Sequence, residues 1–409
     1  MSTTRTFDVI TVGGGPAGMI ASIEAAKRGL SVLLCEKNGR CGKKLNITGK
    51  GRCNITNLCS REEFLENVLS NSRFMYAPLS ALSPEDTVEY FESLGVKTKQ
   101  ERGKRIFPVS DRASDVTDAL VNECRRLGVS FSSGKVTKIL AENGSCTGVE
   151  CGGEVIFADS VIIATGGASY PRTGSDGNGY RLAAQLGHSI VTPEGSLVPL
   201  VSNDSLCPEC MGLSLKNVGV TLVDGKDKAV FCDQGEMLFT HFGLSGPLVL
   251  SASAYVRSAA PYKIVIDLKP ALDLQTLDRR LVRDFSDNSN RDLKNGFSQL
   301  LPSKLIAPFV KKLGIPPETK LHSLKKEQRL GIAKLLKALT VDITGKRPIE
   351  EAIVTSGGVD CREVSPKTME SKLVRGVYFA GEILDIDAYT GGFNLQIAFS
   401  TGFVAGRSC

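Results

Sequence analysis

The sequence predicts an α/β fold in which a Rossmann-like domain is split along the chain, with a β-rich domain and a helical domain inserted into it. Residues 7–36 read as strand, glycine turn, helix, strand and acid, the order of a nucleotide-binding βαβ unit. Short alternating apolar runs begin near residue 191, and apolar residues recur at helical spacing from about residue 273. A further strand and helix, at 377–380 and after 392, complete the first domain.

Length and composition set the scale of the protein. The 409 residues with 42% hydrophobic content exceed the roughly 100 to 200 residues of one domain, so we expect two or three. The start MSTTRTFDVITVGGG lacks the basic and apolar regions of an export signal, and no apolar run approaches the roughly 18 residues of a membrane span. We expect a cytoplasmic protein that does not contact membranes and keeps its twelve scattered cysteines reduced.

The first motif predicts a dinucleotide site. Gly13, Gly15 and Gly18 match G-x-G-x-x-G, which gives a tight turn, close backbone approach to a pyrophosphate, and contact between helix and strand. The helix N-terminus supplies N–H groups and the positive end of a dipole. Glu36 ends the second strand and can accept hydrogen bonds from a ribose. A glycine triplet alone has low specificity, but the complete unit with its acid is specific.

The segment GKKLNITGKGRCN, residues 42–54, follows this unit and is too polar for a buried strand. Because NAD and FAD enzymes share the βαβ unit, such neighbouring segments decide between the two cofactors. The stretch lies where an extended cofactor would leave the second strand. We expect Asn46, Thr48, Gly49 and Arg52 to contact the diphosphate, ribityl chain and flavin edge, with Lys43 and Lys44 as counter-charges. The alternative is a solvated basic loop.

Three later segments favour FAD. In KVTKIL, the backbone near Val136 can meet the adenine, and VIIATGGAS is a buried strand that ends in small residues, including Thr165 and Gly166. GVYFAGEILDIDAYTGGFNLQ supplies a strand, a loop with acids that include Glu382, and a helix opened by Gly391 and Gly392. The positive end of that helix can face the flavin, where negative charge develops on reduction.

Together these motifs resemble a known family. The segments VGGGPAGMIAS, KLNITGKGRCNITN, IIATGGASYPRTGSDGNGYRLAAQLGH, FTHFGLSGPLVLS, TSGGVD and FAGEILDIDAYTGGFNLQIAFSTG resemble the BaiN/RdsA family of FAD-dependent oxidoreductases. The resemblance implies bound FAD and a split FAD domain with β-rich and helical insertions. It implies the cofactor positions Ala17, Glu36, Lys43, Val136, Asp385, Asn394 and Leu395. Lys37 and Gly381, beside Glu36 and Glu382, complete the predicted set; no metal site is expected.

The resemblance leaves the substrate open, because relatives are assigned to ribosomal RNA uridine reduction, steroid ketone reduction or amine oxidation. We favour a reductase that passes hydride from NADH or NADPH through flavin N5 to a C=C bond conjugated with a carbonyl, with ribosomal RNA uridine as substrate and dihydrouridine as product. The alternatives are reduction of a small unsaturated ketone or steroid, oxidation of a small amine, and a non-catalytic RNA-binding flavoprotein.

The predicted domains are a first FAD-binding part at 1–190, a β-rich insert at 191–268, a basic helical insert at 269–341, and a second FAD-binding part at 342–409. Residues 279–347 contain 16 Lys or Arg and 6 Asp or Glu, a net of +10 in a chain of net +6. This basic insert is a candidate contact for ribosomal RNA, although a solvated face is an equal alternative. Otherwise the partner is a small-molecule substrate.

Candidates for catalysis are fewer. His241, in LFTHFGLSGP, is a candidate pocket residue, and Cys53 is either a proton donor or a packed thiol. No cysteine pair five apart follows Glu36, as flavin disulfide reductases require, and no second glycine fingerprint marks an NADPH domain. A nicotinamide donor would therefore visit the flavin and leave. Cys207 and Cys210 form either an inert turn or a pair for transient thiol chemistry.

Overall fold

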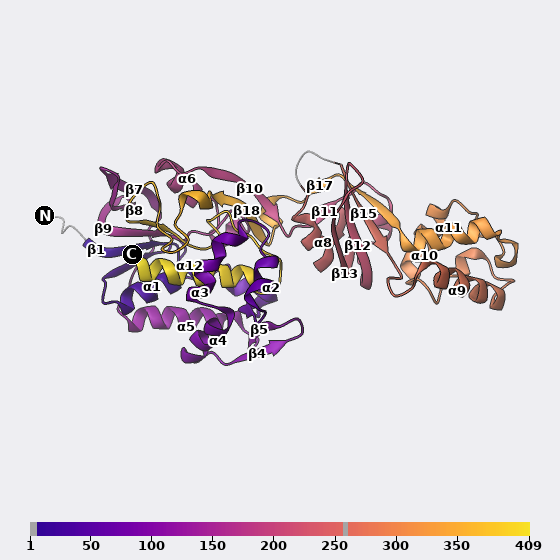
Figure 1. Cartoon of the computed structure of the whole chain (residues 1–409), viewed down its shortest axis with the longest axis horizontal. Helices are drawn as coiled ribbons and strands as arrows, with labels where there is room; N and C mark the ends of the chain where they lie inside the picture. Colours follow the sequence, from indigo (N-terminus) through magenta and orange to yellow (C-terminus); the bar gives the residue numbers. More distant parts are fainter. Residues whose placement is uncertain (1–5, 257–260) are drawn as a thin grey trace. The chain divides into compact units, whose positions relative to one another are not determined.

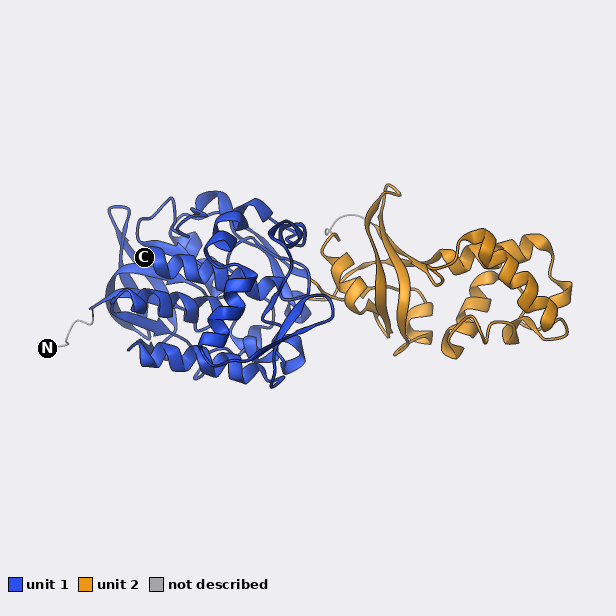
Figure 2. Ribbon diagram, turned by 60° about the horizontal axis from the view of Figure 1, so that its bottom comes forward, with its two compact units in different colours: residues 1–196, 349–409 blue, residues 197–348 orange. Residues whose placement is uncertain are grey.

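The computed structural model describes residues 6–256 and 261–409. The chain divides into two compact units, unit 1 with Met1–Ser196 and Ile349–Cys409 and unit 2 with Leu197–Pro348 (Figure 2). The predicted α/β fold class, with a Rossmann-like domain split in the sequence, is confirmed. Residues 1–5, part of the start used to predict the location, lie outside the described residues.

Unit 1 is built on a seven-stranded sheet. Its order is β6 (Ser130–Ser132), β2 (Val32–Cys35), β1 (Thr6–Val12), β9 (Glu154–Ile163), β8 (Ser145–Cys151) and β7 (Val136–Glu142), and β19 (Val377–Phe379) also pairs with β9. Strands β6, β2, β1, β9 and β19 are parallel, whereas β8 and β7 add antiparallel neighbours beyond β9. β2 is apolar along its length and buried throughout, as expected for an inner parallel strand.

Two helices from opposite ends of the chain pack directly on each other. Helix α1 (Pro16–Lys27) contacts α12 (Phe393–Ser408) (Figure 1). A Cβ on Gly402 would lie 2.3 Å from the carbonyl oxygen of Ala17, and one on Gly406 would lie 2.2 Å from that of Ala21. Glycine at these two positions, one helical turn apart, therefore lets the two backbones approach and brings the C-terminal motif to the glycine turn.

Smaller elements surround this core. Helix α5 (Ala113–Arg126) also packs on α1, and a three-stranded antiparallel sheet has the order β3 (Thr56–Asn57), β5 (Arg105–Pro108), β4 (Thr98–Glu101). Strands β10 (Ile190–Ser196) and β18 (Val354–Val359) form an antiparallel pair. The remaining helices of four or more residues are η1 (Leu45–Gly51) and η2 (Ser72–Met75), both 3-10, and α2 (Arg61–Glu66), α3 (Tyr76–Ala81), α4 (Pro84–Ser93) and α6 (Asn178–Gln185).

Unit 2 combines a second sheet with helices around one apolar core. The sheet has the order β16 (Leu339–Ile343), β15 (Tyr262–Asp267), β12 (Ser214–Asp224), β13 (Ala229–Thr240), β14 (Gly243–Ser245), β11 (Leu200–Val201), β17 (Gly345–Lys346). The helices are α7 (Leu206–Glu209), α8 (Pro247–Ser253), α9 (Leu274–Asp287), α10 (Ser303–Leu313) and α11 (Lys326–Lys337). Val220 and Ile264 of the sheet share a buried cluster with Leu281, Phe309 and Leu336 of the helices.

The edges of unit 2 differ from the expected insert boundaries. Most of β10, expected in the β-rich insert, pairs with β18 in unit 1, and β16, after the helices, returns to the sheet of unit 2. The division of unit 2 into separate β-rich and helical domains stays a prediction.

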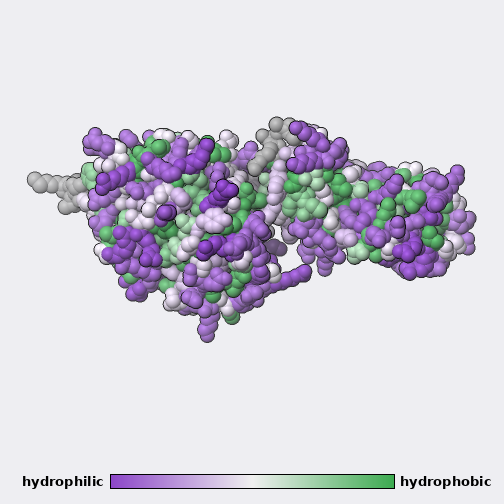
Figure 3. Space-filling view, viewed as in Figure 1, coloured by the Kyte–Doolittle hydropathy of each residue, from purple (hydrophilic) through white to green (hydrophobic). Residues whose placement is uncertain are grey.

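The surface is mostly polar on the face in Figure 3, with apolar residues in smaller groups. Within the described residues, no helix is both long and apolar enough to cross a bilayer.

Candidate functional site

The three glycines of the G-x-G-x-x-G motif after β1 differ in the space around them: a side chain would clash at two of them and would meet no atom at the third. Gly13 has φ +110°, and a Cβ there would lie 2.5 Å from the carbonyl oxygen of Ala164. A Cβ on Gly18 would lie 2.0 Å from the carbonyl oxygen of Gly13, so this glycine lets α1 pack on the turn. Gly15 is different, because no atom lies within 4 Å of its would-be Cβ. The turn thus leaves free space at the N-terminus of α1, where an anion can approach the backbone N–H groups.

Glu36 connects the glycine turn to the loop after β2. Its Oε2 accepts a hydrogen bond from the Gly14 N–H at 2.8 Å, and its Oε1 accepts from the backbone and side-chain N–H groups of Asn38, both at 2.8 Å. A carboxylate oxygen can accept more than one hydrogen bond. Glu36 can therefore hold the turn and still accept from a ribose hydroxyl.

The basic stretch 42–54 is a strained loop and not a regular helix. Gly49, Lys50, Gly51 and Cys53 all have positive φ, and for the two non-glycine residues this conformation is unfavourable. Strained backbone of this kind clusters at functional sites. The loop is held together by local hydrogen bonds, including Thr48 Oγ1 to the Leu45 carbonyl at 2.7 Å.

Arg52 is the main charged anchor of this loop. Its guanidinium pairs with Glu101 and, at 2.6 Å, with Asp111, and it lies 4.3 Å from the ring centroid of Phe107. The hydrogen bond from Arg52 lowers the pKa of Glu101. The carboxylates of Glu101 and Asp111 thus neutralise the positive charge of Arg52, which the sequence predicted to contact the cofactor.

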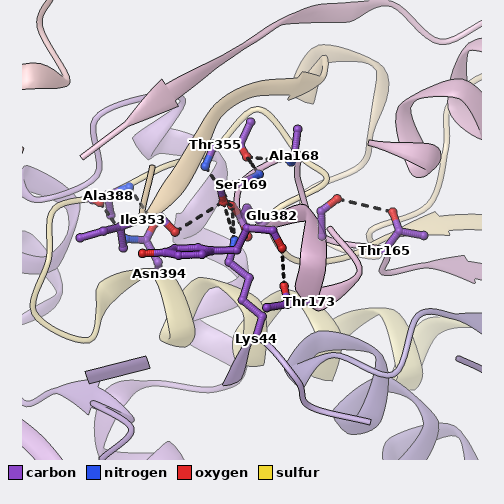
Figure 4. A network of polar contacts seen from close by, with 12 residues as sticks. Lys44, Thr165, Ala168, Ser169, Thr173, Ile353, Thr355, Glu382, Ala388 and Asn394 are labelled. Carbon is purple, nitrogen blue, oxygen red and sulfur yellow. Dashed lines mark hydrogen bonds and ion pairs between the residues drawn. The ribbon is translucent and has the colours of Figure 1, made fainter. Parts of the chain in front are cut away.

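Lys44 lies in a network of hydrogen bonds that joins four segments of the chain (Figure 4). Its Nζ donates to Glu382 Oε2 at 2.7 Å and to Ser169 Oγ at 2.6 Å. Glu382 Oε1 also accepts from the Thr355 N–H at 2.9 Å, and Thr355 Oγ1 accepts from the N–H groups of Ala168 and Ser169. Lys44 and Glu382 are only about one-fifth exposed, 20% and 21%. The ion pair therefore holds the loop of residues 42–54 against the segment after β19. Because Lys44 is paired with Glu382, its charge is not free to neutralise a cofactor phosphate.

The start of α12 is fixed by Asn394. Its Nδ2 donates to the carbonyls of Ala388 and Tyr389 at 2.7 and 3.2 Å, and its Oδ1 accepts from the Ala388 N–H at 3.0 Å. Gly392 has φ +104°, and a Cβ there would lie 2.5 Å from the backbone of Thr56. The helix N-terminus is thereby set against β3, although about 340 residues separate the two segments.

These segments enclose one cavity of about 740 Å³, lined by residues of unit 1. Most predicted cofactor residues line it: Gly13, Gly15, Ala17, Glu36, Lys37, Lys43, Lys44, Thr48, Gly49, Arg52, Val136, Thr165, Gly166, Gly381, Glu382, Gly391, Gly392, Asn394 and Leu395. The size is in the range of ligand pockets. The open space at Gly15, the helix N-termini and the Glu36 carboxylate fit FAD.

Three predicted cofactor residues do not line the cavity. Gly18 serves the packing of α1 on the turn. Asn46 Oδ1 accepts a hydrogen bond from Thr117 Oγ1 at 2.8 Å. The Asp385 carboxylate accepts from Asn71 Nδ2 at 2.9 Å, and burial raises the pKa of Asp385. The polar side chains of Asn46 and Asp385 support the loops from behind, so a direct cofactor contact by either is not seen in the structure.

The two catalytic candidates also lie outside the cavity lining. Cys53 is fully buried, and burial raises its pKa to about 12. A proton-donor role is therefore not supported by its position, and the alternative of a packed thiol agrees with it. His241 belongs to unit 2, is exposed, and contacts the Phe242 ring with centroids 5.0 Å apart.

Cys207 and Cys210 are both buried, and burial raises the pKa of each thiol to about 11. Low thiolate content agrees with an inert pair. Among the described residues, no group of three or more His, Cys, Asp or Glu side chains is placed to hold a metal ion.

Several cavity residues were missed from the sequence. Asn178 lines the cavity and donates through Nδ2 to the Val136 carbonyl at 3.2 Å. Asn54 also lines it, and its Oδ1 is buried without a hydrogen-bond partner in the described chain. Arg105 and Phe107 reach the cavity from β5. GRCN contained a signal for Asn54, but nothing local marked β5 as part of the site.

Comparisons with known proteins show the family and the fold of the chain. Residues 7–408 match the family model described as the HI0933-like protein Rossmann domain. A ribosomal RNA dihydrouridine synthase of Escherichia coli (strain K12) is 31% identical over 403 residues, covering 98% of this chain and 97% of the relative. A 3-dehydro-bile acid delta(4,6)-reductase of Clostridium scindens is 31% identical over 411 residues, covering 97% of each. The open conformation of a flavocytochrome c3 fumarate reductase shares the fold, with a TM-score of 0.50, 16% identity, and coverage of 100% of this chain and 78% of that one.

Proposed function

The chain belongs to the HI0933-like Rossmann-domain family, and from this premise we propose that it is an FAD-dependent oxidoreductase that reduces an activated C=C bond, with a uridine of ribosomal RNA as substrate. The proposal rests on the cavity of unit 1, together with the nearly full-length similarity to a relative named for making dihydrouridine. A substrate of this kind implies action in the cytoplasm.

Different residues of the cavity would hold different parts of FAD. Gly15 leaves room for the diphosphate at the N-terminus of α1, and Glu36, which accepts from the Gly14 N–H, would also accept from the ribose of the cofactor. The Lys44–Glu382 ion pair fixes the loop of residues 42–54 against the segment after β19. When bound, FAD would supply the hydride transfer from a reduced nicotinamide, NADH or NADPH, to the substrate.

The N-terminus of α12, in the C-terminal segment, provides electrostatic stabilisation in the cavity. Asn394 fixes the first turn of α12, and that turn contains no acidic residue. The unopposed positive end of the helix dipole stabilises negative charge in the cavity. The Asn54 Oδ1, which is buried without a hydrogen-bond partner among the described residues, is available to orient a polar ring.

The test is mass mapping of ribosomal RNA from cells with and without the gene. We expect one dihydrouridine to be lost on deletion, restored by the intact gene, and not restored by a variant that cannot bind FAD. An unchanged modification pattern would contradict the RNA substrate.

Reduction of an unsaturated steroid ketone is the second candidate, because the bile acid reductase is equally similar in sequence. Stopped-flow spectra with NADH or NADPH and then an enone would reveal it. Bleaching of the flavin by an amine alone, followed by peroxide release, would instead indicate an oxidase.

A further inference from the structure

One edge of the cavity carries exposed cations beside an exposed apolar side chain. Ile47, Lys50, Arg52 and Arg105 all line the cavity, and we call these four residues the cationic rim. Ile47 is 46% exposed, and Lys50 and Arg105 are also exposed. The rim joins the loop of residues 42–54 to β5, since the guanidiniums of Arg52 and Arg105 both lie near the Phe107 ring, 4.3 and 5.8 Å from its centroid.

The charges at this edge do not cancel. Arg52 and Lys99 share the carboxylates of Glu101 and Asp111, so these four charges balance. Arg105 donates from Nε to the Arg102 carbonyl at 2.9 Å. Within residues 6–256 and 261–409, neither Lys50 nor Arg105 forms an ion pair with a carboxylate. The rim therefore has two positive charges without a carboxylate partner at an exposed edge of the cavity.

The backbone holds Lys50 there at a cost in free energy. Lys50 has φ +59° and lies between Gly49 at +56° and Gly51 at +84°. A left-handed conformation is unfavourable for a non-glycine residue, because its Cβ comes close to the following carbonyl oxygen. The Lys50 side chain makes no hydrogen bond or ion pair in the described chain that would explain this placement. A ligand at the cavity entrance would explain it.

We propose that Lys50 and Arg105 bind the phosphates that flank the target nucleotide of an RNA strand, while Ile47 contacts its ribose or base. This inference rests on the proposed function and adds the residues that recognise the substrate. Two free cations suit a polyanionic strand, repel a cationic amine, and find too few partners on a steroid. A uridine must leave its stack to reach a buried redox centre, and its neighbouring phosphates would then lie at the cavity edge.

The test uses the FAD-loaded, full-length protein and a fluorescently labelled single-stranded RNA oligonucleotide that contains uridine. Anisotropy gives Kd over a salt series for Lys50→Ala and Arg105→Ala. Their matched controls are Lys97→Ala and Arg102→Ala, which remove exposed cations near the same small sheet that do not line the cavity. FAD content is measured in every sample.

Each phosphate contact on a single strand contributes about 0.7 to the slope of log K against log salt. We therefore expect each rim variant to weaken binding about fivefold near 0.1 M salt and to reduce the slope by about 0.7, with the controls close to wild type. Rim variants that bind like their controls, with the slope unchanged, would overturn the proposal. If dihydrouridine still forms in that case, the proposed function stands without this rim. If wild type forms no dihydrouridine and reduces a steroid enone, the proposed function itself fails.

Discussion

Replacing Gly15 with valine is the sharpest test of the cofactor site, because the structure separates its effect on binding from its effect on folding. Gly15 has φ −79° and no atom within 4 Å of a would-be Cβ, so valine fits without strain or clash. The fold should lose about 1 kcal/mol, because glycine is a better N-cap residue than valine. Gly13→Ala should instead destabilise the fold, since its φ is +110° and its Cβ would lie 2.5 Å from the Ala164 carbonyl.

The valine methyl groups would fill the space at the N-terminus of α1 that the diphosphate needs. Loss of about two hydrogen bonds to a charged group, at roughly 1.5 to 3 kcal/mol each, weakens FAD binding by roughly 100-fold or more. The assay is the absorbance of flavin released from purified protein, with thermal unfolding as the check on folding. Gly39→Val is the matched control, because Gly39 also has open space around its Cβ but does not line the cavity. A fully loaded Gly15→Val protein would refute the site.

Three further predictions concern the supports of the site. Lys44→Met should weaken FAD binding roughly tenfold or more, because it leaves the Glu382 carboxylate without its ion-pair partner in the cavity that we propose binds the anionic cofactor; isothermal titration should show recovery in Lys44→Met/Glu382→Gln, and no recovery would contradict the pairing. Asn394→Asp should lower both the melting temperature and the flavin redox potential, because a carboxylate would face the carbonyls of Ala388 and Tyr389 and oppose negative charge near α12; a redox titration showing an unchanged or raised potential would argue against this geometry. Burial lowers the pKa of His188, whose ring contacts Glu363 at 3.1 Å and Ser371 at 2.7 Å. Above the pKa of histidine in the unfolded chain, about 6.5, the ring is neutral in both states and His188 should not affect the free energy of unfolding. As the pH falls from there through the lowered pKa of the folded state, His188 should destabilise the fold. Melting temperatures between pH 7 and 5 should fall less steeply for His188→Asn, and parallel slopes would exclude His188 as the cause.

The sequence by itself determined the βαβ unit and the class of cofactor. Gly13, Gly18 and Glu36 have roles set by short-range geometry: the turn, the contact of helix with strand, and the acid at the strand end all lie within 30 residues. The glycine pair before α12 could be recognised from its place at a helix start, whereas the close approach of Gly392 to Thr56 depends on tertiary packing. The polar character of residues 42–54 also predicted a ligand loop, because no apolar pattern competed with that interpretation, and several of these residues line the cavity.

Tertiary structure decided which polar groups are free to meet a ligand. Lys44, Arg52 and Asn46 looked available in sequence, but each has a partner 59 to 338 residues away, Glu382, Asp111 and Thr117. Lys50 and Arg105, by contrast, form no ion pair with a carboxylate in the described chain. A hydrogen bond or ion pair depends on distance in space, and distant segments meet only because α12 packs on α1 and β5 pairs with β3. Local sequence therefore gives the chemistry of each side chain, while the packing of remote elements decides whether that chemistry is used internally or presented to the cavity.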